Sequence, residues 1–98
     1  MTETERKEIL KATLHKYGLE AQLDVAIEEL SELMKAIIKY KRLGYRSDVI
    51  ENLCEETADV QIMLDQLRMF LNFETNEIEE EKLYRLSRRI NKMKDGNK

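Results

Sequence analysis

The chain has 98 residues, of which 42% are hydrophobic and 38% are charged, with no proline and no tryptophan. This balance favours long helices over sheets or disorder, so the sequence predicts one all-α domain over residues 1–98. The formal net charge is −3, from 17 basic and 20 acidic residues mixed along the sequence. No broad basic face is predicted, and polymeric DNA or RNA is not expected as a partner.

The sequence also carries no sign of a membrane segment. No apolar run approaches the ~20 residues that cross a bilayer, and the polar residues 1–7 do not resemble a signal peptide. Cys54 is the single cysteine, which excludes a disulfide framework within the chain and fits a reducing compartment. We therefore expect a cytoplasmic protein with no membrane partner, and we expect Cys54 to be a small core residue.

The first predicted helix begins after Thr2 and ends at Gly18. The Thr2 hydroxyl and Glu5, three residues further on, form a capping-box pattern. Glycine is the favoured residue just beyond the end of a helix. The side chains expected to face inward are Ile9, Leu10, Leu14 and Tyr17.

The second predicted helix is the longest, from Leu19 to Leu43, and ends at Gly44. Its large aliphatic side chains recur at spacings of four and three, which is typical of the seam of a helical bundle with a shallow crossing angle. The seam residues are Leu23, Ile27, Leu30, Met34 and Ile37.

The third helix is predicted to follow a short connection, residues 44–47, and to span Val49 to Leu71. Asp48 is expected to cap it, with Glu51 as the capping-box partner. Because a short connection makes antiparallel neighbours, helices two and three should form a hairpin. A fourth helix is predicted from Asn76, and its apolar stripe consists of Leu83, Leu86, Ile90 and Met93.

A hairpin of this size leaves apolar surface to cover, because a chain of this length buries only about 60–65% of its unfolded surface. Helix three has a second apolar face formed by Ala58, Ile62 and Met69. We therefore predict a homodimer in which two helix pairs complete a four-helix bundle.

Acidic residues interrupt the apolar faces of helices two and three. Glu29 and Glu32 are three residues apart and share one face of their helix, as do Glu56 and Asp59. At about 100° per residue, Glu29 and Glu56 fall inside the apolar arcs, and Glu32 and Asp59 fall at their edges. Burying carboxylates costs several kcal/mol unless a cation or strong donors compensate, so these positions predict a binding site.

The hairpin should bring the four carboxylates together. Glu32 and Asp59 each lie about 13 residues from the turn, so they are expected at the same level. Four acids at matching height repel one another unless divalent ions neutralise them. Hard carboxylate oxygens suit Mg²⁺ or Mn²⁺, although the sequence does not fix the number of ions.

The acidic pattern also resembles a family signature. Glu28-Glu29-x-x-Glu32, a spacer of 23 residues and then Glu56-x-x-Asp59 resemble the motif of the MazG-like all-α nucleoside triphosphate pyrophosphohydrolases. The resemblance covers helices two and three and implies a Mg²⁺-dependent hydrolase that cuts the α–β phosphoanhydride of a ribo- or deoxynucleoside triphosphate. The products would be the nucleoside monophosphate and pyrophosphate. A tetramer of two of the predicted dimers would resemble part of the family.

By this resemblance Glu29, Glu32, Glu56 and Asp59 would be the metal ligands. Mg²⁺ prefers a few carboxylates together with phosphate oxygens and water, and it can activate that water as the nucleophile. A carboxylate that the metal does not fully engage could accept the proton, and the candidates for this catalytic role are Glu29 and Glu32.

A triphosphate also needs cations. Lys35 lies three residues beyond Glu32, and three basic residues share one side of helix four. The candidate phosphate-binding residues are therefore Lys35, Lys82, Arg85 and Arg89. A solvated basic stripe is the competing interpretation of the same residues.

Two other classes of protein compete with this interpretation. A di-iron carboxylate bundle would need Glu-x-x-His motifs, and the only histidine, His15, is not part of one. A non-catalytic helical module that binds a nucleotide or a protein would not need all four acidic residues, which are present here. The preferred base and sugar are left open by the sequence.

Overall fold

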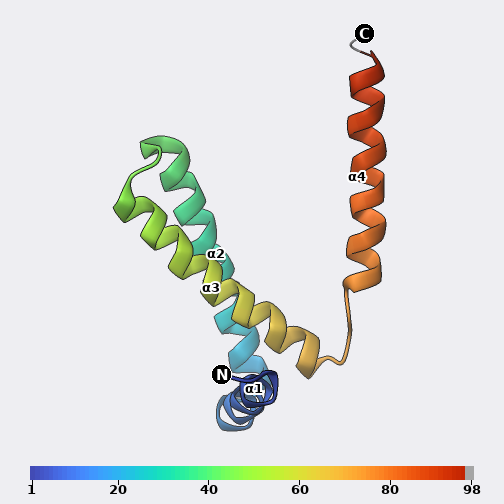
Figure 1. Cartoon of the computed structure of the whole chain (residues 1–98). Helices are drawn as coiled ribbons and strands as arrows, with labels where there is room; N and C mark the ends of the chain where they lie inside the picture. The colour runs from blue at the N-terminus through green and yellow to red at the C-terminus, as the bar shows by residue number, and fades with distance from the viewer. Residues whose placement is uncertain (97–98) are drawn as a thin grey trace.

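The computed structural model describes residues 1–96, so residues 97–98 of the predicted domain lie outside the described part. The prediction of an all-α fold is confirmed, and residues 1–96 contain no strand. Figure 1 shows the four helices, which are α1 (Glu3–Tyr17), α2 (Leu19–Leu43), α3 (Ser47–Phe70) and α4 (Asn76–Gly96).

The ends of α1 and α2 are where the sequence places them. The Thr2 hydroxyl accepts a hydrogen bond from the Glu5 backbone N–H at 3.1 Å, as the capping-box pattern predicts. Gly18 and Gly44 follow the two helices with φ of +86° and +75°. Residues with a Cβ rarely adopt this backbone conformation, so glycine is needed at both helix ends.

The predicted cap of α3 is wrong. The helix begins at Ser47, Arg46 occupies the N-cap position, and no side chain caps the helix. Asp48 lies inside the first turn, where its carboxylate pairs with the Arg46 guanidinium at 2.8 Å. The hydrogen bond from Arg46 lowers the pKa of Asp48 and so keeps a negative charge at the helix N-terminus. The guanidinium therefore engages the carboxylate that was expected to cap the helix.

The centre of the fold is the antiparallel hairpin of α2 and α3, which Figure 1 shows running side by side from the turn at Gly44. The apolar arc predicted for α3 is confirmed at its centre, where Val49, Val60 and Met63 are buried. They pack against Ala26 and Ala36 of α2, which are 5% and 1% exposed. Small alanine side chains allow the backbones of α2 and α3 to approach each other closely.

Of the predicted seam of α2, only Leu23 takes part in the contact with α3, where it is half-buried beside Met63 and Gln66. Ile27 and Met34 are 67% and 63% exposed, and Leu30 and Ile37 are also exposed. Ala26 and Ala36, which lie on the neighbouring face of α2, are buried against α3 instead. Periodicity finds the widest apolar stripe of a helix, and here that stripe lies outside the hairpin. The result is a hairpin with a large uncovered aliphatic face on α2, which we call the outer face of α2 (Ile27, Leu30, Met34 and Ile37).

Helix α1 crosses the open end of the hairpin. Leu10 is buried, as predicted, whereas Ile9 and Tyr17 are exposed, contrary to the sequence-based expectation. Arg6 ties α1 to α3 because its Nη2 lies 2.6 Å from Asp65 Oδ2. Leu14 is half-buried, so two of the four side chains predicted to face inward are at least partly covered and two are not.

Helix α4 stands apart from the hairpin in Figure 1. A short linker, residues 71–75, joins it to α3, and Arg68 Nε donates a hydrogen bond to Thr75 Oγ1 at 3.2 Å. Thr75 in turn donates to Glu79 Oε2 at 2.5 Å. These bonds fix the first turn of α4 to the end of α3.

Cys54 is exposed on α3, so the prediction of a core cysteine is wrong, because its position lies on the side of the helix away from α2. Among the described residues, no helix is both long enough and apolar enough to cross a membrane.

Candidate metal centre

Three of the four predicted ligands meet at the hairpin. One carboxylate oxygen each from Glu29 of α2 and from Glu56 and Asp59 of α3 lie within 4.8 Å of one another. The i,i+3 spacing places Glu56 and Asp59 on one face of α3, and the antiparallel hairpin sets Glu29 against them. We call these three residues the carboxylate triad.

The triad lies at the rim of the α2–α3 contact rather than in its centre. Glu29 and Glu56 are half-buried and Asp59 is exposed, which follows the predicted order of inner and edge positions. Their neighbours Glu28 and Glu55 are exposed, as the helical wheel predicts. The triad therefore has one side against the hairpin and one side open to a ligand.

The carboxylate of Glu29 is held in an unfavourable environment. Partial desolvation raises its pKa first, followed by the negative charge of Asp59 and a hydrogen bond with it. The charge of Glu56 raises the pKa of Glu29 further. Each cause favours the protonated form, so the triad in its fully ionised form carries electrostatic repulsion that a cation would relieve.

The pKa of Glu56 is raised, like that of Glu29. Desolvation raises its pKa most, and the charges of Asp59, Glu32 and Glu55 add to the rise. The influence of Glu32 shows that this fourth predicted ligand lies near the triad, although its oxygens do not converge with the other three. Three convergent hard oxygens with open space beside them fit a divalent ion that keeps water or phosphate as its other ligands.

The level of Glu32 differs from the prediction. Glu32 was expected opposite Asp59, but it is Glu29 whose oxygen lies close to Asp59, while the charge of Glu32 raises the pKa of Glu56. The pairs Glu29–Asp59 and Glu32–Glu56 are both symmetric about Gly44, which ends α2. The prediction placed the centre of the turn one to two residues later, and this difference shifts Glu32 away from the level of Asp59. Glu32 also pairs with Lys35, one turn further along α2, at 3.3 Å.

The predicted phosphate-binding residues are not gathered at the triad. Lys35 is on the same helix as Glu29 and Glu32 and lies closest to the site in sequence. Lys82, Arg85 and Arg89 belong to α4, which stands apart from the hairpin (Figure 1). Arg85 instead pairs with Glu81 on its own helix at 3.1 Å. Within one chain, the described structure therefore joins only Lys35 to the acidic cluster.

A buried polar layer lies two turns from the triad, and sequence reasoning missed it. Gln22 of α2 and Gln66 of α3 are 7% and 3% exposed, and Gln66 Oε1 has no hydrogen-bond partner. They are seven residues from Glu29 and Asp59 respectively, so they share the faces that carry the triad. This seven-residue spacing from the triad is the sequence signal that could have predicted the buried glutamines.

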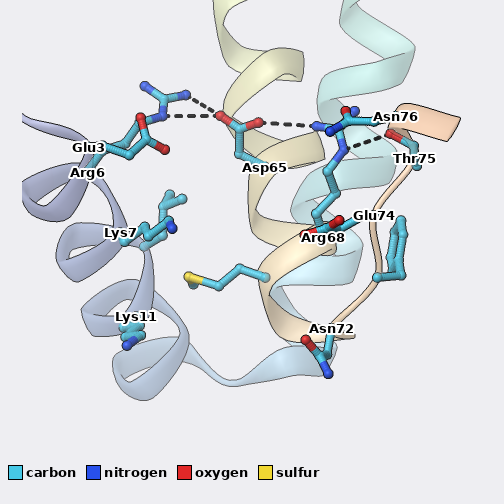
Figure 2. Close-up of a pocket in the computed structure, with 13 residues that line it drawn as sticks. Glu3, Arg6, Lys7, Lys11, Asp65, Arg68, Asn72, Glu74, Thr75 and Asn76 are labelled. Atoms are coloured by element: carbon cyan, nitrogen blue, oxygen red, sulfur yellow. Dashed lines mark hydrogen bonds and ion pairs between the residues drawn. The ribbon is translucent and has the colours of Figure 1, made fainter. Parts of the chain in front are cut away.

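A separate cavity lies between α1, the end of α3 and the linker (Figure 2). It has a volume of about 490 Å³ and contains none of the triad residues. Figure 2 shows Asp65 between Arg6 and Arg68, with dashed lines to both guanidinium groups. The Arg6–Asp65 pair joins α1 to α3 beside the cavity, whereas the Arg68–Asp65 pair lies within α3. Because its lining contains no triad residue, the cavity is distinct from the candidate metal centre.

Comparisons of the chain with protein families, with curated proteins and with solved structures find no match. The MazG-like resemblance therefore rests on the two acidic motifs, their spacing and the order in which they occur.

Proposed function

We propose that this protein is a Mg²⁺-dependent nucleoside triphosphate pyrophosphohydrolase, acting in the cytoplasm as a homodimer, with Mn²⁺ as an alternative ion. The observation that supports this most is the convergence of the Glu29, Glu56 and Asp59 oxygens within 4.8 Å. The motif resemblance supports the same reaction, namely cleavage of (d)NTP to (d)NMP and pyrophosphate.

In this proposal the triad holds the ion on the open side of the hairpin. When bound, Mg²⁺ supplies a Lewis acid for phosphate oxygens and lowers the pKa of a water ligand. Glu29 approaches from α2, while Glu56 and Asp59 approach from α3, so the ion would also tie the two helices together. The raised pKa values of Glu29 and Glu56 support this role, because a cation removes the repulsion that raises them.

Glu32 is the better of the two candidates for general base. Its oxygens lie outside the convergent set, so they stay available to accept a proton from the attacking water. The ion pair with Lys35 joins two exposed side chains and is easily exchanged for other partners. Lys35 would then be free to bind the phosphates, and Glu29 would remain a metal ligand.

The test is pyrophosphate release from a panel of ribo- and deoxynucleoside triphosphates, with Mg²⁺, with Mn²⁺ and with a chelator. We expect metal-dependent release, lowered at least about a hundredfold by Glu56→Gln, because even outer-shell partners of a metal change activity by 10–100-fold. The exposed neighbour provides a matched control, and Glu55→Gln should keep the activity.

The competing proposal is a non-catalytic helical module that binds a nucleotide or a protein. It predicts no release from any triphosphate by a folded protein, with ligand affinity unchanged in Glu56→Gln. The panel therefore separates the two proposals in one experiment.

A further inference from the structure

The cavity between α1, the end of α3 and the linker is large enough for a small organic molecule. Its volume of about 490 Å³ lies within the range of about 300–1,000 Å³ that is usual for ligand pockets. Its lining comes from α1, from α3, from the linker 71–75 and from the first residue of α4. No residue of the carboxylate triad is part of this lining, so a ligand here would occupy a site separate from the candidate metal centre.

A chain of hydrogen bonds holds the walls of the cavity in place. Asp65 Oδ2 accepts bonds from Arg6 Nε at 3.1 Å and from Arg6 Nη2 at 2.6 Å, and Asp65 Oδ1 accepts a bond from Arg68 Nη1 at 3.2 Å. Arg68 Nε donates to Thr75 Oγ1, and the Thr75 hydroxyl donates to Glu79, which extends the chain into the linker and α4. The cavity is therefore formed before a ligand arrives, and a preformed site lowers the entropic cost of binding.

Basic residues outnumber acidic residues around the cavity, and the two kinds are unevenly placed. Asp65 forms an ion pair with each of two guanidinium groups, so the charges at its end of the cavity are paired. Figure 2 shows Lys11 and Asn72 at the end of the cavity away from Asp65, where no acidic lining residue is drawn. The basic lining residues are Arg6, Lys7, Lys11 and Arg68, and the acidic ones are Glu3, Asp65 and Glu74.

The end of the cavity away from Asp65 is suited to an anion. Lys7 and Lys11 are four residues apart, so both lie on one face of α1. Among the described residues neither lysine forms an ion pair, and Asn72 lies across the cavity from Lys11 in Figure 2. A phosphate monoester carries about two negative charges at neutral pH, which matches two ammonium groups better than the single charge of a carboxylate does.

Apolar side chains from three segments also line the cavity. Leu10 of α1 is 6% exposed, Met69 of α3 is half-buried, and Phe73 of the linker is 42% exposed. An inorganic anion alone would leave these side chains in contact with water. A ligand that carries an apolar body beside its anionic group would cover them, and the buried apolar area would add to its affinity.

We propose that this cavity binds a small phosphate monoester with an apolar body. The phosphate group lies at Lys7, Lys11 and Asn72, and the apolar body lies against Leu10 and Met69. The binding is non-covalent and uses no metal ion, so it does not depend on the proposed pyrophosphohydrolase activity.

Nuclear magnetic resonance of the methionine methyl groups tests this proposal, because Met69 lines the cavity and Met34 lies on the outer face of α2. The full chain, isotope-labelled at these methyl groups, is titrated in chelator with phenyl phosphate, and Met69→Leu assigns the signal. We expect a saturable shift of the Met69 signal and none of the Met34 signal. Inorganic phosphate, phenol and benzoate should each bind at least about tenfold more weakly, because each lacks the phosphate group or the apolar ring.

Paired substitutions of lysines test the place of the phosphate group. Lys7→Gln combined with Lys11→Gln should raise the Kd for phenyl phosphate at least about tenfold, because charge-assisted hydrogen bonds to the phosphate are lost. Both side chains are exposed, so the substitutions remove no core contact. The matched control, Lys39→Gln with Lys41→Gln, removes the same two charges from exposed positions of α2 and should leave the Kd unchanged.

Three results would overturn the proposal. The first is no saturable shift of the Met69 signal up to about 10 mM phenyl phosphate, and the second is equal weakening in the two double variants, which would indicate a general charge effect. The third is binding of benzoate or inorganic phosphate as tightly as phenyl phosphate. The titration contains neither a divalent ion nor a triphosphate, so failure of this proposal and failure of the proposed activity are distinguishable.

Discussion

Glu29 and Glu56 are the residues whose environment departs most from that of ordinary surface carboxylates. Desolvation and the charge of Asp59 raise both pKa values, and the charge of Glu56 adds to the rise at Glu29. Without a cation this raises the free energy of the folded state at neutral pH. The same arrangement prepares the hairpin for a divalent ion, because the repulsion that costs stability without the ion becomes attraction with it.

Glu29→Gln should therefore stabilise the metal-free protein at neutral pH. The fold raises the pKa of Glu29, so its contribution to stability is fully present below the unfolded pKa and is lost as the pH rises through the folded pKa. Glutamine at position 29 does not ionise, so the variant does not lose this stability as the pH rises. Thermal unfolding in a chelator should give a higher midpoint for the variant at pH 7.5 and an equal midpoint near pH 3.5.

The control is Glu28→Gln on the exposed side of the same turn, which should change the midpoint little at either pH. A Glu29→Gln variant that is less stable than the parent at pH 7.5 in chelator would contradict the repulsion described here.

Gln66 offers a second prediction at the scale of one residue. Its side chain is almost fully buried and its Oε1 atom accepts no hydrogen bond. Leaving such an atom unpaired costs about 1–3 kcal/mol, and methionine has a similar shape without the polar group. Gln66→Met should raise the free energy of unfolding by about 1 kcal/mol in urea denaturation, and a loss of stability would show that the amide is paired in solution.

At the scale of the helices, the contact between α2 and α3 depends on small side chains. Ala36 is only 1% exposed and faces α3, so a larger side chain there would push the two backbones apart. Ala36→Leu should lower the free energy of unfolding by about 1–3 kcal/mol. Ala21→Leu, on the exposed side of the same helix, should have little effect, and equal effects of the two changes would argue against a close contact at Ala36.

The bounds of the helices could be predicted because their signals are local. Thr2, Gly18 and Gly44 act through their own backbone geometry, which needs no knowledge of the rest of the fold. The helix faces that contact each other were harder to predict than the helix bounds. The aliphatic stripe of α2 is more apolar than the alanine face, yet the alanines make the contact, because close backbone approach depends on the partner helix.

The same distinction applies to the candidate site. The i,i+3 spacing within each acidic motif is local, and it correctly predicts that Glu56 and Asp59 share a face. The level of Glu32 depends on the register of the hairpin, which the sequence sets only approximately through the turn. The position of the α4 cations relative to the triad depends on the direction of the linker, for which the sequence has no strong signal.

At the scale of the whole molecule, the exposed apolar surface of one chain is the reason for proposing a homodimer. The outer face of α2 and the stripe of α4 both lie open in the single chain. If two copies bury these surfaces in a homodimer, folding and association are one equilibrium, and stability depends on protein concentration.

Thermal unfolding should therefore shift with dilution. Each tenfold dilution should lower the stability of a folded dimer by about 1.4 kcal/mol, so the midpoint should fall as the concentration is reduced. Leu86→Glu places a charge in the middle of the exposed apolar stripe of α4 and should reduce this dependence by weakening the dimer. The surface variant Ser87→Glu provides a control on the same helix turn. A midpoint that is independent of concentration in the unmodified protein would contradict an obligate dimer.

The most direct measurement of the central claim is an analysis of the products formed from a nucleoside triphosphate with Mg²⁺ present. We predict equal amounts of nucleoside monophosphate and pyrophosphate, no reaction in chelator, and at least about a hundredfold less product from Glu56→Gln. Formation of nucleoside diphosphate and inorganic phosphate, or turnover that persists unchanged in chelator, would contradict the account.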